Sequence, residues 1–508
     1  MTNFTTQQQQ VINHVCSSDR SLVVEAVAGS GKTTTILGAI KATDKQNMAV
    51  IAFNKSIAEE ISAKLVGVDW KKCEAKTAHS FGLRFFTKTF GRPEVNGRKV
   101  SFIIDRLIQS RDPSEAELII KASAKIANLV SLAKQSLIGY LCPLDDISKW
   151  TDLGFHHDVF DDLPANLPYE NLIQWSMAVL RISNEDTKKI DFDDMIYMPL
   201  LFKCSFGNGK DVIFVDEAQD TNAARRALVR ALLRKGGKVI AVGDRRQAIY
   251  GFTGADADAL DLIKQDFNAE ELPLSVCFRC AKSIVQYAQQ WVPHIEWAEG
   301  AGEGSVVCAK QADVDWAATS SADVVLCRNN KPIVTMAYDL LKQGVACYVE
   351  GRDVGEALKK LARKWKIKTL AQLDTRLESY LERETSKALA QKNEGLAQMI
   401  EDRVETLQVF MDRVRAKGQN DIQDLINDID GLFKDTKPGE RPNCLTLSSI
   451  HKSKGREWSR VFWLDKEETL PSKYARQAWQ FGQEDNLCYV ASTRAEEQLV
   501  RLSSTGGQ

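Results

Sequence analysis

The chain has 508 residues, of which 44% are hydrophobic, 8% aromatic and 27% charged. This composition is typical of a globular protein with about three or four compact units, and it excludes collagen-like, disordered and coiled-coil proteins. The 67 Lys and Arg residues balance 68 Asp and Glu residues, so the formal net charge is −1. Bulk charge therefore provides no attraction for a polyanion, and nucleic-acid binding would need a local basic or aromatic surface.

The N-terminal sequence and the cysteines indicate the cellular compartment. No apolar run approaches the ~18 residues of a membrane helix, and residues 1–10 lack the basic start and apolar centre of a signal peptide. The eleven scattered cysteines favour reduced thiols over a disulfide framework. We therefore expect an intracellular, cytoplasmic protein. Cys277 and Cys280 have the spacing of a metal or redox pair, but burial as small apolar side chains is the favoured interpretation.

The first half of the chain predicts strands, helices and one long helical interval. A strand is expected at residues 21–26, followed by the turn VAGSGKT and a helix that begins near Lys32. Further apolar runs at 48–53, 211–215 and 238–242 are short, as expected for strands buried on both faces of a parallel sheet. Between residues 83 and 189 the strand signal nearly vanishes and helical periodicity replaces it, as at 116–137, which predicts a helical insert.

The second half repeats this organisation. Strand-like runs occur at 305–310, 323–327, 444–447 and 460–464, and the interval 354–433 between them is helical. The predicted fold class is therefore α/β, with two parallel-sheet units that are each interrupted by a mostly helical insert.

Two segments have the residue types of a nucleotide-hydrolysis site. In the turn after the first strand, backbone N–H groups and the helix N-terminus can surround phosphate oxygens, while Lys32 would reach the β- and γ-phosphates and Thr33 would bind Mg²⁺. Ala26 occupies the position of the first glycine of the common motif, so the strict pattern is not met. After the strand at 211–215, Asp216 could hold Mg²⁺ and Glu217 could deprotonate the attacking water. A solvated acidic turn is the less favoured alternative, because a phosphate loop lies upstream.

Further motifs occur in a fixed order along the chain. They are FTTQQ (4–8), AVAGSGKT (26–33), AFNKSIAEE (52–60), TAHSFG (77–82), DFDDM (191–195), VDEAQD (215–220), VGDRRQAIYGFTGA (242–255), CFRC (277–280), LSSIHKSKGREW (447–458) and YVASTRA (489–495). This series resembles the UvrD/Rep-type superfamily 1 DNA helicases. The resemblance implies two RecA-like domains of the P-loop NTPase class, the first at 1–82 and 187–276 and the second at 277–350 and 441–508. Helical inserts are expected at 83–186 and 351–440.

The resemblance also implies roles for individual residues at the nucleotide. Gln8 would recognise the adenine edge and Phe278 would stack on it, Arg279 and Arg494 would reach the γ-phosphate, Gln247 would act as a sensor and Glu457 would contact the ribose. The implied nucleotide-binding set is Gln8, Ala28, Gly29, Ser30, Gly31, Lys32, Thr33, Thr34, Phe278, Arg279, Glu457 and Arg494. The implied catalytic set is Lys32, Asp216, Glu217, Gln247, Arg279 and Arg494, with Thr33 and Asp216 as metal ligands. The expected cofactors are ATP and Mg²⁺.

DNA binding is also implied by the resemblance. The expected contacts are Phe53, His79, Tyr250, Phe252, Arg328, Asn330, Ser449 and His451, with Ser80 and Phe81 beside His79. Aromatic stacking holds any base, which suits a motor that moves over every sequence, although a lone Phe such as Phe81 is more often a core residue. Phe252 occupies the usual position of Trp in the family and Thr253 that of Arg, so one DNA or coupling contact of the family lacks its arginine. In the second insert, residues 359–368 (KKLARKWKIK) could bind duplex phosphates or form a solvated helix face.

The sequence therefore predicts an ATP-dependent 3′→5′ translocase and helicase on single-stranded DNA and on junctions with duplex, which separates strands or removes proteins. The expected setting is the nucleoid, with DNA repair among the possible pathways. One alternative is the motor subunit of a separate helicase–nuclease complex, since only 14 residues follow Arg494. The other is a nucleotide-gated DNA-binding protein, which would require a defective hydrolysis site.

Overall fold

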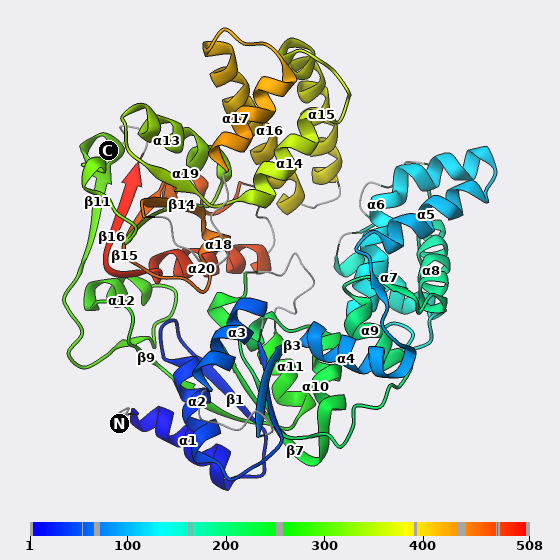
Figure 1. The fold of residues 1–508 in the computed structure, drawn as a ribbon, viewed down its shortest axis with the longest axis vertical. Helices are drawn as coiled ribbons and strands as arrows, with labels where there is room; N and C mark the ends of the chain where they lie inside the picture. The colour runs from blue at the N-terminus through cyan, green and yellow to red at the C-terminus, as the bar shows by residue number, and fades with distance from the viewer. Residues whose placement is uncertain are drawn as a thin grey trace. The chain divides into compact units, whose positions relative to one another are not determined.

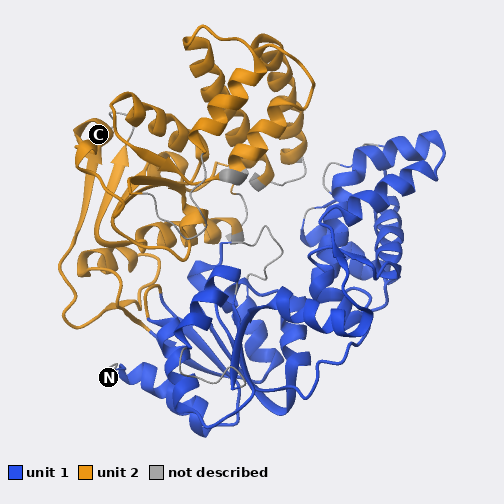
Figure 2. Cartoon of the chain, in the orientation of Figure 1, with its two compact units in different colours: residues 1–27, 31–274 blue, residues 28–30, 275–508 orange. Residues whose placement is uncertain are grey.

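The computed structural model describes residues 4–52, 54–65, 72–157, 159–160, 163, 166–249, 258–390, 394–433, 443–473, 475 and 478–503. The chain forms two compact units, coloured separately in Figure 2: unit 1 contains residues 1–27 and 31–274, and unit 2 contains residues 28–30 and 275–508. The predicted α/β fold class is confirmed, because each unit has a parallel sheet interrupted in sequence by helices.

Unit 1 is built on a six-stranded sheet within the described residues. Its strands, in spatial order, are β3 (Cys73–Thr77), β2 (Met48–Ala52), β6 (Lys210–Val215), β7 (Leu233–Gly243), β1 (Leu22–Ala26) and β8 (Glu270–Leu274). Neighbouring strands are parallel, with Val24 of β1 opposite Val242 of β7. The four apolar runs predicted as strands in this unit all lie on this sheet, because β-branched residues buried on both faces stabilise a parallel strand.

Successive side chains of each strand point to opposite faces of this sheet, and a different set of helices packs on each face. Leu22 and Val24 pack with α1 (Thr6–Ser17), α2 (Lys32–Ala42) and α3 (Lys55–Lys64). Val23 of the same strand packs into a second core with α4 (Ala78–Phe90), α9 (Asp194–Leu201), α10 (Ala223–Leu232) and α11 (Ala259–Asp266). Figure 1 labels these helices around the sheet. This layering places the carboxyl ends of the parallel strands at one edge, where ligands bind in such folds.

The insert of unit 1 is mostly helical. It comprises α5 (Lys99–Gln109), α6 (Pro113–Gln135), α7 (Ile147–His156) and α8 (Tyr169–Glu185), with the two-residue strands β4 (Glu94–Val95) and β5 (Lys189–Ile190) beside them. Fully buried Lys134 of α6 lies 2.6 Å from Asp191 and 2.7 Å from Asp194, and Lys99 of α5 lies 2.8 Å from Asp194. These buried ion pairs join the insert to α9.

One glycine of the TAHSFG segment is required by close packing between helices. A Cβ atom on Gly82 of α4 would lie 2.0 Å from the carbonyl oxygen of Met195 in α9. That oxygen belongs to the backbone and cannot move aside without shifting α9. A glycine at this position therefore permits the close approach of α4 to α9.

Unit 2 has a second six-stranded parallel sheet within the described residues. Its order is β11 (Ser305–Lys310), β16 (Ala495–Ser503), β15 (Trp458–Leu464), β12 (Asp323–Cys327), β14 (Leu445–Ser449) and β13 (Cys347–Val349). One face shares a core with α13 (Asn330–Lys342) and with the helices of the second insert, α14 (Arg352–Ala362), α15 (Leu370–Ala390), α16 (Glu394–Ala416) and α17 (Ile422–Leu432). On the opposite face, Trp463 packs against Trp291, which follows α12 (Lys282–Ala288). No helix in the described part of the chain is long and apolar enough to cross a membrane.

Candidate functional site

The predicted phosphate loop has the backbone conformation that glycine permits. Gly29 and Gly31 have φ of 68° and 77°, in the left-handed region that other residues rarely adopt. α2 begins at Lys32, directly after Gly31, so its first N–H groups open onto the loop. Thr33 and Thr34 lie in this first turn, half-buried and exposed respectively. The strand, turn and helix predicted from the sequence are all present.

Lys32 lies among acidic side chains at the carboxyl edge of the sheet of unit 1. Its Nζ is 2.9 Å from Oε2 of Glu217, and the two side chains are 13% and 16% exposed. Burial acts to lower the pKa of Lys32, but the carboxylates of Glu217, Asp216 and Asp244 outweigh it and raise that pKa. Lys32 is therefore a charged ammonium group at neutral pH.

The two predicted carboxylates, Asp216 and Glu217, directly follow β6. The backbone N–H of Glu217 donates to Oδ1 of Asp216 at 3.0 Å, and Glu217 itself has a left-handed backbone with φ of 49°. A non-glycine residue in this region costs free energy and is common at functional sites. Asp216 is 5% exposed, and burial together with repulsion from Glu217 raises its pKa to about 6, although Lys32 acts in the opposite direction.

Two further polar residues, Gln219 and Asp244, belong to this group, although the sequence predicted no role for them. The side-chain amide of Gln219 donates to Oε2 of Glu217 at 2.6 Å, and its Oε1 accepts the backbone N–H of Asp244 at 3.0 Å. Nε2 of the predicted sensor Gln247 donates to Oδ2 of Asp244 at 2.8 Å. Burial raises the pKa of Asp244 despite the attraction of Lys32. The signal for Asp244 was its position two residues after the strand run 238–242, at the same sheet edge as Asp216.

Gln8 has a local structural contact in addition to its predicted role. Its side-chain Oε1 accepts the backbone N–H of Thr5 at 3.0 Å, while its own N–H donates to the Thr5 hydroxyl at 3.2 Å. This capping box begins α1 and fixes a side chain that is only 4% exposed. Adenine recognition by Gln8 stays a prediction.

The predicted arginines belong to unit 2. Arg279 donates from Nε to Glu457 at 2.6 Å and from a terminal nitrogen to the Thr493 carbonyl at 3.3 Å. Arg494 is 1% exposed and donates to the carbonyls of Val490 and Arg456, each at 3.0 Å. The structure thus brings Arg279 together with Glu457, the residue predicted to contact the ribose. Their roles toward a nucleotide stay predictions.

Other predicted nucleotide residues are also in unit 2. Residues 28–30 are grouped with this unit, in which the N–H of Ala28 donates to the Tyr489 hydroxyl at 2.8 Å and the N–H of Phe278 donates to the Gly29 carbonyl at 2.9 Å. Ser30 is buried, whereas Phe278 is 49% exposed, as a stacking side chain must be. Cys277 and Cys280, on either side of Phe278, are buried free thiols.

The predicted DNA contacts are only partly visible. Phe53, Tyr250 and Phe252, with Thr253, lie outside the described residues. His79 is half-buried beside exposed Ser80 at the start of α4. Phe81 is completely buried in the core of unit 1, so the expectation that it lines a DNA channel is wrong, because its position on α4 faces the sheet.

In unit 2, the predicted DNA contacts bond to neighbouring side chains. Arg328 makes a two-point contact with Glu484 at 3.1 and 3.3 Å. The side-chain amide of Asn330 donates to Asp402 of α16 at 2.7 Å. Ser449 precedes the short helix α18 (Ile450–Ser453), where burial, Arg328 and Lys454 lower the pKa of His451 to about 3.

The basic segment 359–368 is partly engaged within its own insert. Lys359 lies 2.7 Å from Glu356 and 2.6 Å from Asp430, and Lys364 lies over the ring of Tyr380 at 4.1 Å. Trp365 packs against the same Tyr380. These contacts support the interpretation of this run as a solvated helix face, because two of its charges already have partners.

Comparison with known proteins gives two family matches. Residues 4–268 match the model of the UvrD/REP helicase N-terminal domain, and residues 352–505 match that of the UvrD-like helicase C-terminal domain. The chain is 26% identical over 311 residues to the ATP-dependent DNA helicase PcrA of Staphylococcus epidermidis, and 26% identical over 315 residues to that of Staphylococcus aureus. These alignments include 58% and 57% of this chain and 40% of each relative. The chain therefore matches about two fifths of the length of these relatives.

Proposed function

Because this chain belongs to the UvrD/Rep helicase family, we propose that it is an ATP-dependent DNA helicase that moves 3′→5′ along single-stranded DNA. Strand separation at junctions and removal of bound proteins are the two outcomes of such movement. The observation that supports the proposal most directly is the group formed by Lys32, Glu217, Asp216 and Asp244 beside a left-handed glycine loop.

The contacts of Glu217 suggest how ATP binding and hydrolysis are linked. Lys32, the expected partner of the γ-phosphate, is the residue that pairs with Glu217 at 2.9 Å. A phosphate at the loop competes for this ammonium and so releases the Glu217 carboxylate to accept a proton from water. Gln219, 2.6 Å from the same oxygen, keeps that carboxylate oriented.

The donor set also fits Mg²⁺. Magnesium in nucleotide sites is usually bound by one or two carboxylates, water and the phosphates of the substrate. Among the described residues, no group of three or more His, Cys, Asp or Glu side chains is arranged to hold a metal ion by itself. We propose that Asp216 and the Thr33 hydroxyl would hold the ion, which would neutralise charge on the phosphates. Burial, and after it repulsion from Glu217, raises the pKa of Asp216, and a cation bound to this carboxylate would offset both effects.

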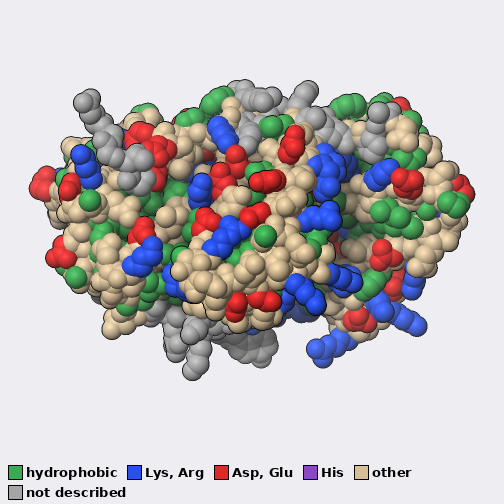
Figure 3. Space-filling model, turned by 90° about the horizontal axis from the view of Figure 1, so that it is seen from above, with side chains coloured by type: hydrophobic (Ala, Val, Ile, Leu, Met, Phe, Trp, Pro, Cys, Tyr) green, Lys and Arg blue, Asp and Glu red, His purple; other side chains and the backbone are tan. Residues whose placement is uncertain are grey.

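We propose that aromatic side chains contribute to DNA binding, because a net charge of −1 provides no bulk attraction for a polyanion. Figure 3 shows side chains of both charges on the face seen from above, with several basic side chains close together right of its centre. Phe192, in the DFDDM segment, is 60% exposed although its neighbour Asp191 is buried. An exposed ring beside a buried residue can stack on a base, and we propose Phe192 as a DNA contact that was not predicted from the sequence.

The experiment that tests the proposal measures ATP hydrolysis with and without single-stranded DNA. Strand displacement on matched forks with 3′ or 5′ tails, and streptavidin displacement from each DNA end, then determine polarity. We expect DNA-stimulated hydrolysis and activity on the 3′-tailed fork only. Nucleotide-dependent DNA binding without turnover would instead favour a nucleotide-gated binding protein, and turnover without displacement would favour a motor that needs a partner subunit.

A further inference from the structure

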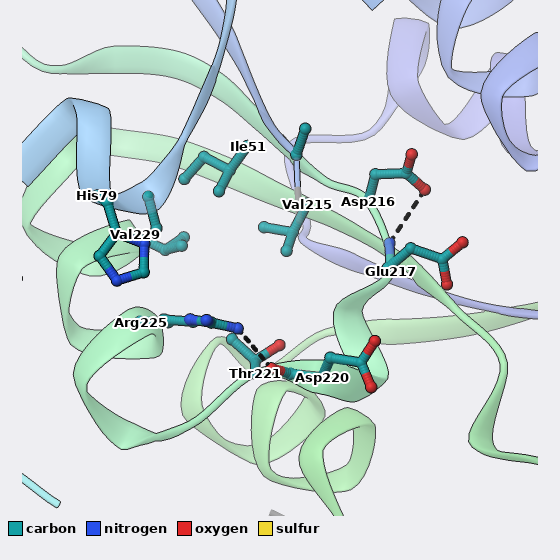
Figure 4. Close-up of a pocket in the computed structure, with 11 residues that line it drawn as sticks. Ile51, His79, Val215, Asp216, Glu217, Asp220, Thr221, Arg225 and Val229 are labelled. Atoms are coloured by element: carbon teal, nitrogen blue, oxygen red, sulfur yellow. Dashed lines mark hydrogen bonds between the residues drawn. The ribbon is translucent and has the colours of Figure 1, made fainter. Parts of the chain in front are cut away.

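A small cavity lies between the catalytic carboxylates and the start of α4 in unit 1. Figure 4 shows its lining, which includes Ile51, His79, Asp216, Glu217, Asp220 and Arg225. Its volume is about 20 Å³, which is room for about one water molecule. The cavity therefore places the predicted metal and base residues on one side and the predicted DNA contact His79 on the other.

Arg225 is the cationic side chain of this cavity. It projects from the first turn of α10, where its backbone N–H donates to the capping oxygen of Asn222 at 3.0 Å. Its guanidinium donates to the backbone carbonyl of Asp220 at 2.7 Å, as drawn in Figure 4. Asp220 ends the single turn η1 (Ala218–Asp220), which begins directly after Glu217. Arg225 therefore holds the far end of the loop that orients the Glu217 carboxylate.

The same guanidinium acts on His79. Burial and the charge of Arg225 lower the pKa of His79 to about 4, so the imidazole is neutral at pH 7. Arg225 itself stays charged because Asp220 and Asp193 attract it, although burial lowers its pKa. A neutral imidazole has one donor and one acceptor nitrogen, so it can both donate and accept a hydrogen bond at a base or sugar.

A second chain of contacts connects Arg225 to the helical insert. Asp193, which attracts Arg225, accepts the Ser131 hydroxyl of α6 at 2.5 Å. Gln135 of α6 donates to Asp193 at 3.4 Å and accepts the side-chain amide of Asn222 at 3.2 Å. Arg225 thus lies where α4, α6, α10 and the loop after β6 meet.

On this geometry, and resting on the proposed function, we propose that Arg225 is a positioning residue that couples DNA binding at His79 to the placement of Asp216 and Glu217. A movement of the N-terminal turn of α4 on binding DNA changes the surroundings of the guanidinium. The guanidinium transmits the change through the Asp220 carbonyl to the loop that contains Glu217. Two binding sites linked in this way typically influence each other by about 5–150-fold.

The test compares the stimulation ratio, which is the kcat of ATP hydrolysis at saturating single-stranded DNA divided by that without DNA. We expect Arg225→Ala to lower this ratio about 10-fold, while DNA affinity measured by fluorescence anisotropy changes less than about threefold. Arg225→Lys, which keeps the charge, should restore part of the ratio. A variant that is merely less folded would lower both rates equally and leave the ratio unchanged.

The matched control is Arg230→Ala on the same helix, because this side chain is 58% exposed and its partners, Asp266 and the Phe267 ring, do not line the cavity. It should keep the wild-type ratio. His79→Ala should lower the ratio as Arg225→Ala does, and the double variant should be no worse than either, since residues in one coupling path are not additive.

Several results would overturn the proposal. A wild-type ratio in Arg225→Ala, or in Arg225→Gln should the alanine variant fail to fold, would exclude the coupling role. A loss of DNA affinity with an unchanged ratio at saturation would make Arg225 a DNA-binding residue instead. If the wild-type protein itself shows no stimulation by DNA, the proposed function fails too. Failure of the Arg225 proposal alone differs from this result, because the wild-type protein is then still stimulated by DNA.

Discussion

Replacing Asp216 with Asn should stabilise unit 1 at neutral pH while it removes the proposed metal ligand. Asp216 is 5% exposed, and its pKa is raised from 3.8 to about 6 by burial and by Glu217. The folded state therefore favours the protonated carboxyl, whereas water in the unfolded state favours the carboxylate. An asparagine keeps the shape and can still accept the Glu217 N–H, which Asp216 accepts at 3.0 Å, without a buried charge.

The magnitude follows from this difference in pKa. A shift of about two units corresponds to about 3 kcal/mol, at roughly 1.36 kcal/mol per unit. The pKa of Asp216 is higher in the folded state than in the unfolded state. Its contribution to the free energy of unfolding is therefore fully present below about pH 4 and is lost as the pH rises through about 6. The asparagine variant does not lose stability in this way, because its side chain does not titrate. It should therefore be about 3 kcal/mol more stable than the wild type at pH 7 and nearly equal to it at pH 4.

Hydrogen exchange measured by mass spectrometry can test this within unit 1. Amides of peptides from β2 and β6 should exchange about 100-fold more slowly in Asp216→Asn at pH 7, because exchange follows the free energy of opening. The control is Asp152→Asn, whose side chain is 68% exposed. Equal protection at pH 7, or a gain of the same size at pH 4 and pH 7, would refute the argument that a buried charge at Asp216 destabilises this fold.

Three other predictions concern the charged residues. Glu217→Gln should keep ATP binding but slow hydrolysis by orders of magnitude, as measured by nucleotide affinity and single-turnover rates, and near-normal turnover would exclude Glu217 as the base. Arg279→Ala should lower the kcat of ATP hydrolysis much more than the affinity for ADP, whereas equal losses of ATP and ADP affinity at unchanged kcat would make it a simple binding group. Lys134→Met should cost about 3–5 kcal/mol in urea unfolding, because Asp191 would lose its buried cationic partner and Asp194 one of its two, and a change below about 1 kcal/mol would contradict this.

Local sequence was sufficient for most of the secondary structure and for the phosphate loop. The run at 323–327 matches β12 because β-branched residues buried on both faces have few other stable conformations. The helix after the loop begins at Lys32 as predicted, since the preceding Gly31 supplies a left-handed residue. Short strands without an apolar run, such as β4 at Glu94–Val95, gave no signal because their two residues are exposed.

The sequence by itself determined the order of strands, turns and helices, and the motif residues that identify the family. Only the tertiary structure decided which polar groups meet. Asp244 joins Lys32 and Glu217 because parallel strands bring their carboxyl ends to one edge, although these residues are far apart in the chain. Burial at that edge raises the pKa of Asp216, and the packing of α4 against α10 brings Arg225 near His79. Such effects depend on distance and on exclusion of water, and neither quantity is encoded by the spacing of residues along the sequence.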